Sequence, residues 1–284
     1  MVPRRSVAAA LLWVAVLPGS PAGAAERTPA DLVLVQQGTL PIILTAPHGG
    51  RETIPGIEPR HDKTNVEAYG KWGGFQRGTD TNTDILAQRI AAEIAKLTGK
   101  KPYLVVARFS RTYIDANRPP ELALDSPEAR PYYDTYHRSV RRFIDEILGN
   151  YPAGLLIDVH GQGKDPDALM RGTINGRAVE RLLRRAGVEA VTGPNGIYGQ
   201  LETNGFKVFP GNDVPPGGRS EDAGFNGGYT VFIYGSHNRT GIDAIQMEFG
   251  TRYRQKAVLD KSARDAARAI AAFHEAYLKQ PASR

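Results

Sequence analysis

Short apolar runs alternate along the chain with longer segments of helical periodicity. Four runs rich in isoleucine, leucine and valine are closed by glycine or polar residues and predict buried strands: 40–46, 102–110, 154–162 and 242–250. A further run at 32–38 lies directly ahead of the first, and the two together predict a short hairpin.

Four other segments place their apolar residues three and four positions apart, which predicts helices at 83–99, about 131–148, 177–186 and 257–277. Strands that alternate with helices indicate an α/β fold with a mostly parallel or mixed sheet. In such sheets, functional sites form at the carboxyl ends of the strands. Residues 193–228 are rich in glycine and proline and show little periodicity, which is typical of a functional loop such as a lid or a specificity loop.

Two histidines and a glutamate stand at the ends of three predicted strands: His48, His160 and Glu248. A lone histidine in such a place is more often structural, but two, each beside glycine after a buried strand, favour a metal site. Imidazole nitrogens are zinc ligands, and a carboxylate nearby accepts a proton from the water that the metal activates. The pattern therefore predicts a zinc hydrolase rather than a binding or structural protein.

Composition narrows this picture. The 284 residues are 41% hydrophobic and 23% charged, enough for one large ordered domain. The net charge of +6 is scattered, with no basic stripe, and gives no reason to expect nucleic acid binding. There is no cysteine, so any metal must be held by histidine, carboxylates and water, as in a catalytic site. Nucleophile-elbow, phosphate-loop and dinucleotide motifs are also missing from the sequence.

The first residues have the order of a secretory signal peptide. Arg4 and Arg5 precede an apolar stretch at 7–17, and the small residues Ala22-Gly-Ala24 follow. The apolar stretch is too short to span a bilayer, and no later segment is apolar enough to do so. We predict a signal peptide at 1–24 and a single catalytic domain at 25–284, exported to the periplasm or secreted.

Several of these segments together resemble one enzyme family. They are Ala46-Pro-His-Gly-Gly50, Ser110-Arg-Thr-Tyr-Ile-Asp-Ala-Asn-Arg118, Asp158-Val-His160, the run 227–235 and Ala244-Ile-Gln-Met-Glu248. In this order they resemble the N-formylglutamate amidohydrolases, which are similar in turn to the zinc carboxypeptidases and to the succinylglutamate desuccinylase and aspartoacylase enzymes. The resemblance implies a phosphorylase/hydrolase-like three-layer α/β/α sandwich with a mixed sheet, and a zinc-dependent amide hydrolase.

The resemblance also implies roles for the residues at the strand ends. His48 and His160 match the two metal histidines, and Glu248 matches the general base. The third ligand departs from the carboxypeptidase pattern, because Arg51 stands three residues after His48. Glu52 would take its place if the loop bulges. Asp84, in Asp80-Thr-Asn-Thr-Asp84, is the alternative, although an acid at a helix start is also explained by the helix dipole.

Other residues are assigned to the substrate. Asn117 and Arg118 resemble the pair that holds a substrate carboxylate in the carboxypeptidases, a task that suits the planar guanidinium. Arg111 polarises the scissile carbonyl or adds a second contact to the anion. Tyr234 caps the substrate or packs in the core, and the same two alternatives hold for Tyr229.

Asp158 is either a carboxylate that orients a neighbouring group or a solvated strand residue. His237 and Asn238 are minor loop candidates. The remaining histidines, His61, His137 and His274, are expected to be structural or exposed.

The reaction expected is hydrolysis of the amide bond of an N-acyl amino acid, as in N-formylglutamate, or of a small peptide with a free carboxylate. One alternative is a zinc carboxypeptidase or cell-wall peptide amidase. A second is an exported binding protein that keeps the fold without turnover.

Overall fold

A computed structural model describes residues 27–61 and 67–279, and the predicted signal peptide lies outside these ranges. One seven-stranded sheet forms the centre, in the order β1-β3-β2-β4-β7-β5-β6. The strands are β1 (Val33–Gln36), β2 (Ile42–Ala46), β3 (Tyr103–Ala107), β4 (Leu155–Gln162), β5 (Ala168–Gly172), β6 (Lys207–Phe209) and β7 (Asp243–Gly250).

The sheet is mixed, as predicted. Strands β3, β2, β4 and β7 run parallel, whereas β1 is antiparallel to β3, and β5 is antiparallel to β7. The predicted hairpin is wrong, because β3 lies between β1 and β2 and pairs with both. The apolar pattern of β1 marks it as a strand but contains no information about its partner, and this information comes only from the assembled sheet.

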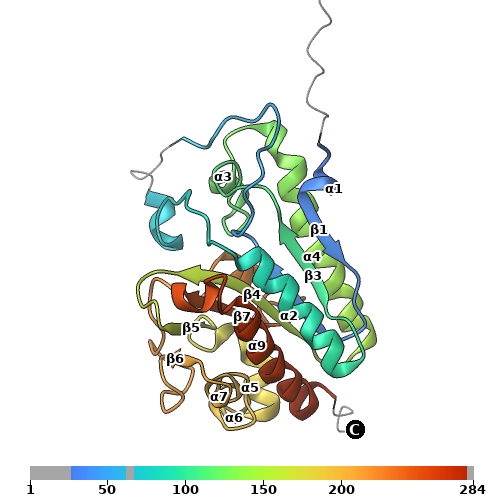
Figure 1. Cartoon of the computed structure of the whole chain (residues 1–284), viewed down its shortest axis with the longest axis vertical. Helices are drawn as coiled ribbons and strands as arrows, with labels where there is room; N and C mark the ends of the chain where they lie inside the picture. The colour runs from blue at the N-terminus through green and yellow to red at the C-terminus, as the bar shows by residue number, and fades with distance from the viewer. Residues whose placement is uncertain (1–26, 62–66, 280–284) are drawn as a thin grey trace, which may run out of the picture.

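Helices cover both faces of the sheet, which confirms the three-layer sandwich (Figure 1). One face packs against α2 (Thr83–Thr98), α5 (Glu180–Ala186), α6 (Glu189–Thr192), α7 (Ile197–Thr203) and α9 (Leu259–Phe273). The other packs chiefly against α4 (Arg130–Asn150), with α1 (Pro29–Leu32), α3 (Pro120–Ala123) and α8 (Tyr229–Tyr234). Both faces of the central strands are therefore buried, which is why these strands read as continuous apolar runs rather than alternating ones.

The long predicted helices agree with the structure. Helix α2 ends at Gly99, whose left-handed φ of 70° makes a glycine the natural cap. Helix α4 buries Tyr136, Val140 and Phe143 along one side. Helix α9 continues into the π-helical turn η5 (His274–Leu278). Each helix is defined by its apolar stripe, so the local pattern was enough to predict it.

The segment 193–228 is more ordered than predicted, because it contains α7 and the edge strand β6. Its second part, between β6 and α8, contains no helix or strand and is a loop, as predicted. Within the described ranges, no helix combines the length and the hydropathy that a bilayer crossing requires.

Candidate functional site

The candidate site lies where β2, β4 and β7 end. On the face toward α4, these strands begin with apolar residues such as Leu156 and Ala244 and become polar toward their carboxyl ends. The polar positions follow at every second residue, Asp158 and His160 on β4 and Gln246 and Glu248 on β7. His160 and Glu248 are direct neighbours in the register of β4 and β7. The predicted meeting of the strand ends is thus observed.

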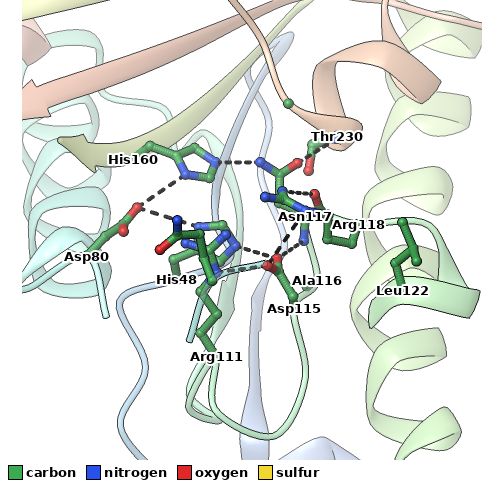
Figure 2. A network of polar contacts seen from close by, with 12 residues as sticks. His48, Asp80, Arg111, Asp115, Ala116, Asn117, Arg118, Leu122, His160 and Thr230 are labelled. Atoms are coloured by element: carbon green, nitrogen blue, oxygen red, sulfur yellow. Dashed lines mark hydrogen bonds and ion pairs between the residues drawn. The ribbon is translucent and has the colours of Figure 1, made fainter. Parts of the chain in front are cut away.

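His48, Asp80 and His160 form a compact cluster at this edge, with ligand atoms that all lie within 4.8 Å of one another (Figure 2). The Asp80 Oδ2 atom lies 3.5 Å from His48 Nδ1 and 3.2 Å from His160 Nδ1. The two rings meet edge to face, with an interplanar angle of 79°. Both imidazoles thus direct the same type of nitrogen toward one carboxylate oxygen.

The outer nitrogen of each imidazole is held by a buried carboxylate. His48 Nε2 donates to Asp115 Oδ1 at 2.7 Å, and His160 Nε2 donates to Asp158 Oδ2 at 2.8 Å. Asp115 and Asp158 are fully buried. Carboxylates in this position fix the tautomer and orientation of metal-binding histidines and increase the basicity of the inner nitrogen. Asp158 is therefore an orienting carboxylate rather than a solvated strand residue.

The cluster fits a divalent cation. His48 Nδ1 is buried and has no hydrogen-bond partner, an arrangement that is costly unless an ion or a water occupies the space it faces. Burial would raise the pKa of Asp80, yet the hydrogen bond to His160 and the charges of both histidines lower this pKa below its usual range. Two nitrogens and one carboxylate oxygen, with a further side open, make a donor set typical of catalytic zinc.

Asp80 occupies the place that the sequence analysis assigned to Glu52 or Asp84. Its amide donates to the carbonyl oxygen of His48 at 3.0 Å, and its Oδ2 accepts the amide of Gly161 at 3.0 Å. The turn that carries Asp80 is fixed by Arg254, whose Nη1 donates to Thr81 O at 2.8 Å. These bonds join the turn before α2 directly to the ends of β2 and β4.

Neither of the two expected carboxylates belongs to the cluster. Glu52 continues along the end of β3, where its backbone pairs with Phe109, and its side chain forms an ion pair with Arg27. Asp84 lies in the first turn of α2. The chain after His48 is extended and does not bulge, so the side chain of Glu52 does not reach the histidines. Asp84 lies beyond the turn that places Asp80 beside them.

Glu248 lies beside the cluster on β7 and lines the same cavity. Burial raises its pKa to about 7, with help from the charges of Asp80 and Asp158 and against the effect of His160. Its Oε1 accepts a hydrogen bond from Gln246 Nε2. A carboxyl with this pKa is suited to receive and release a proton near neutral pH.

Asp115 connects the histidine cluster to two arginines. Its Oδ2 accepts a hydrogen bond from Arg111 Nε at 2.8 Å, and Arg118 Nε lies 4.0 Å away. Arg118 directs its terminal nitrogens to the carbonyl oxygens of Asn117 and Gly74, at 2.8 and 3.1 Å. The terminal nitrogens of Arg111 make no such bond among the described residues. Arg111 is therefore the arginine that retains free donors toward the cavity.

A cavity of about 450 Å³ joins these groups, and it is lined by His48, Asp80, Arg111, Asn117, Arg118, His160 and Glu248, among others. The segments 71–80 and 223–228 form its walls. A volume in this range fits a small molecule or a short peptide. Lys71 and Trp72 also line it. The loop after β6 thus contributes to the site, as its composition suggested.

Tyr234, Tyr229, His237 and Asn238 do not line the cavity. Tyr234 is buried, and its hydroxyl lies 3.0 Å from His137 Nδ1. His137 Nε2 donates to Ala116 O at 3.0 Å and so supports the turn that carries Asp115 and Asn117. Tyr234 therefore packs in the core and does not cover the substrate cavity.

Sequence reasoning missed three residues of this site. Asp80 follows Gly78 closely, and Asp115 stands two residues before Asn117. These positions were the signal that the sequence offered for each residue. Gln246 is two residues before Glu248 on the same strand face, so the alternation of β7 placed it beside the base.

The fold of this chain is similar to that of two known protein structures. The chain superposes on the crystal structure of N-formylglutamate amidohydrolase from Ralstonia eutropha JMP134 with a TM-score of 0.54 and 17% identity, over 84% of this chain and 96% of that one. A gene product from Agrobacterium tumefaciens superposes with a TM-score of 0.52 and 16% identity, over 85% and 96% of the two chains. No family model matches the chain, and no curated protein matches it in sequence. The resemblance read from the motifs is thereby confirmed at the level of the fold.

Proposed function

We propose that this protein is an exported zinc-dependent amidohydrolase that cleaves the amide bond of an N-acyl amino acid or of a small carboxylate-bearing peptide. The observation that carries the proposal is the meeting of His48, Asp80 and His160 with the buried Glu248 in one cavity. Burying the carboxylate of Glu248 is costly, and a chemical role explains why it stands here.

His48, Asp80 and His160 would hold the zinc ion, oriented by Asp115 and Asp158. A bound zinc ion supplies Lewis acidity, which acidifies water and polarises a carbonyl group. Glu248 takes the proton of the attacking water and passes it to the leaving amine nitrogen as the carbon–nitrogen bond breaks. With its pKa near 7, the same carboxyl serves in both directions at neutral pH.

Arg111 orients the substrate in the cavity. Its Nε is fixed on Asp115. Its two terminal nitrogens, which have no hydrogen bond to any residue of the described ranges, are available for a substrate carboxylate or for the oxyanion that forms during attack. Arg118, expected to hold the carboxylate, is engaged with Gly74 and Asn117, so its main task is to fix the cavity wall. Asn117 supports this wall, since its Oδ1 accepts the amide of Thr230 at 2.8 Å.

The substrate class follows from these donors and from the fold. The relative with the higher TM-score acts, by its name, on N-formylglutamate, which is an N-acyl amino acid. The cavity of about 450 Å³ also accommodates a short peptide, so that a carboxypeptidase or a cell-wall peptide amidase is the second candidate. The signal-peptide pattern at 1–24 supports export and therefore substrates outside the cytoplasm.

Metal content and activity test the proposal together. Wild type, Asp80→Ala and Glu248→Gln are purified, loaded with zinc and measured by elemental analysis. They are then assayed against N-acyl amino acids and C-terminal peptides. We expect about one zinc in wild type and in Glu248→Gln and reduced zinc in Asp80→Ala. Of these three proteins, only wild type should hydrolyse the substrate. Glu52→Gln is the matched control, because Glu52 lies outside the cluster, and it should keep both zinc and activity.

Two results would contradict the proposal. Activity that survives both chelation and Glu248→Gln excludes this mechanism. Zinc bound without hydrolysis of any compound in the panel favours a binding protein on the same fold.

A further inference from the structure

We propose that Gln246 is a positioning residue that holds the general base Glu248 and links it to the glycine loop 224–228. The inference rests on the proposed function for the role of Glu248. The link itself is a matter of hydrogen bonds and can be tested without a substrate.

The side-chain amide of Gln246 bridges two different elements. It is only 4% exposed and lies on β7, on the same strand face as Glu248. Its Nε2 donates to Glu248 Oε1, and its Oε1 accepts the backbone amide of Gly228. Because the amide of Gly228 is always a donor, the oxygen of Gln246 must face it. The NH₂ group must then face Glu248, so the orientation of the amide is fixed.

Glycines allow the loop to come this close. A Cβ on Gly172, the β5 neighbour of Gln246 in the sheet, would stand 2.7 Å from Gly227 N and 2.7 Å from Phe225 O. A Cβ on Gly228 would stand 2.1 Å from Asn117 Nδ2. Gly227 has a φ of 124°, a conformation that favours glycine. The loop therefore rests directly on the sheet edge, with its backbone within reach of Gln246.

The bridge has a defined effect on the base. Because Oε1 of Glu248 accepts the bond from Gln246, Oε2 is the oxygen with both lone pairs available for proton transfer. The bond restrains the orientation of the Glu248 carboxyl, and through Gln246 this orientation is linked to the position of the loop. Gln246 has no hydrogen bond to His48, Asp80 or His160, so the bridge is separate from the metal ligands.

The test compares Gln246→Met and Gln246→Ala with Tyr198→Phe. Methionine keeps the length of the side chain and removes both hydrogen bonds. Tyr198→Phe is the matched control. It removes the 3.2 Å hydrogen bond from the Tyr198 hydroxyl to the backbone oxygen of Gln246 and leaves the bridge made by the Gln246 side chain intact. Zinc content, thermal midpoint, kcat, KM and amide exchange of the segment 224–228 are measured for each.

We expect both Gln246 variants to keep their zinc and to lose about 10- to 100-fold in kcat, the usual effect of an orienting partner, with KM within about threefold. Amide exchange at 224–228 should be faster in them and unchanged in Tyr198→Phe, which should also keep its kcat. An unchanged kcat, loss of zinc, or a higher KM at constant kcat would overturn the positioning role. If amide exchange at 224–228 stays slow in Gln246→Met, the bridge is overturned, even if no substrate is found. If exchange is faster in Gln246→Met but the wild-type protein hydrolyses nothing, the bridge stands and only the proposed function is refuted.

Discussion

Replacing Asp115 by asparagine should damage two properties at once, because this carboxylate holds both a histidine of the cluster and a buried arginine. Its Oδ1 binds His48 Nε2 at 2.7 Å, and its Oδ2 binds Arg111 Nε at 2.8 Å. Burial would raise the pKa of Asp115, but the charges of Arg111, His48 and Arg118 hold this pKa well below its usual value. The group is therefore an anion in the folded protein. Asparagine keeps the shape, removes the charge and turns an NH₂ group toward the donors of His48 and Asn117 or toward that of Arg111.

The magnitudes follow from these contacts. Loss of the carboxylate behind His48 should weaken zinc binding by about 10- to 100-fold. Loss of the anion beside a buried arginine should lower the free energy of unfolding by about 3–5 kcal/mol, since Arg111 is left without its partner. Asp158→Asn is the matched comparison, because Asp158 binds His160 Nε2 and Thr45 Oγ1 but no arginine. It should weaken zinc binding to a similar degree at a smaller cost in stability.

Urea denaturation and zinc competition with a chelator separate the two effects. The double variant Asp115→Asn/Arg111→Met should recover part of the lost stability, because the unpaired charge is gone, but none of the zinc affinity. The reasoning is refuted if Asp115→Asn keeps its zinc affinity within twofold. It is also refuted if the double variant is no more stable than Asp115→Asn alone.

Three more predictions concern the same region. Arg111→Lys should raise KM for a carboxylate-bearing substrate by about tenfold, since a point charge replaces a bidentate donor, and a KM equal to wild type in steady-state assays would argue against this contact. His137→Gln should flatten the acid dependence of stability. Burial lowers the pKa of His137 to about 4, below the value near 6.5 of the unfolded chain, so wild type loses at most about 3 kcal/mol as pH falls from about 6.5 to 4. The urea midpoints of wild type and His137→Gln are measured across this pH range. An equal dependence of the midpoint on pH in the two proteins would exclude the predicted effect of His137. Gly228→Ala should reduce kcat/KM by about tenfold or more, because its Cβ would stand 2.1 Å from Asn117 Nδ2 and force the loop or the side chain to move; an unchanged kcat/KM in the same assay would show that the site tolerates this shift.

The sequence went furthest where a local pattern contained the information. Apolar runs closed by glycine defined β2, β4 and β7, and helical spacing defined α2, α4 and α9. The rule that sites form at the carboxyl ends of strands then predicts from the sequence alone that His48, His160 and Glu248 lie together. These predictions succeeded because strand and helix periodicity are properties of neighbouring residues.

Partners far apart in the chain were decided by the tertiary structure. Asp80 rather than Glu52 joins the histidines, because the chain after His48 stays extended along β3 and the turn before α2 folds back onto His48. Asp115 reaches His48 across 67 positions, and Gly228 reaches Gln246 across 18, through bonds that no spacing rule predicts. The sequence by itself determined the layers, the strand ends and the kinds of side chain available. Packing alone determined which of these side chains touch, because a hydrogen bond depends on the distance between atoms in space and not along the chain.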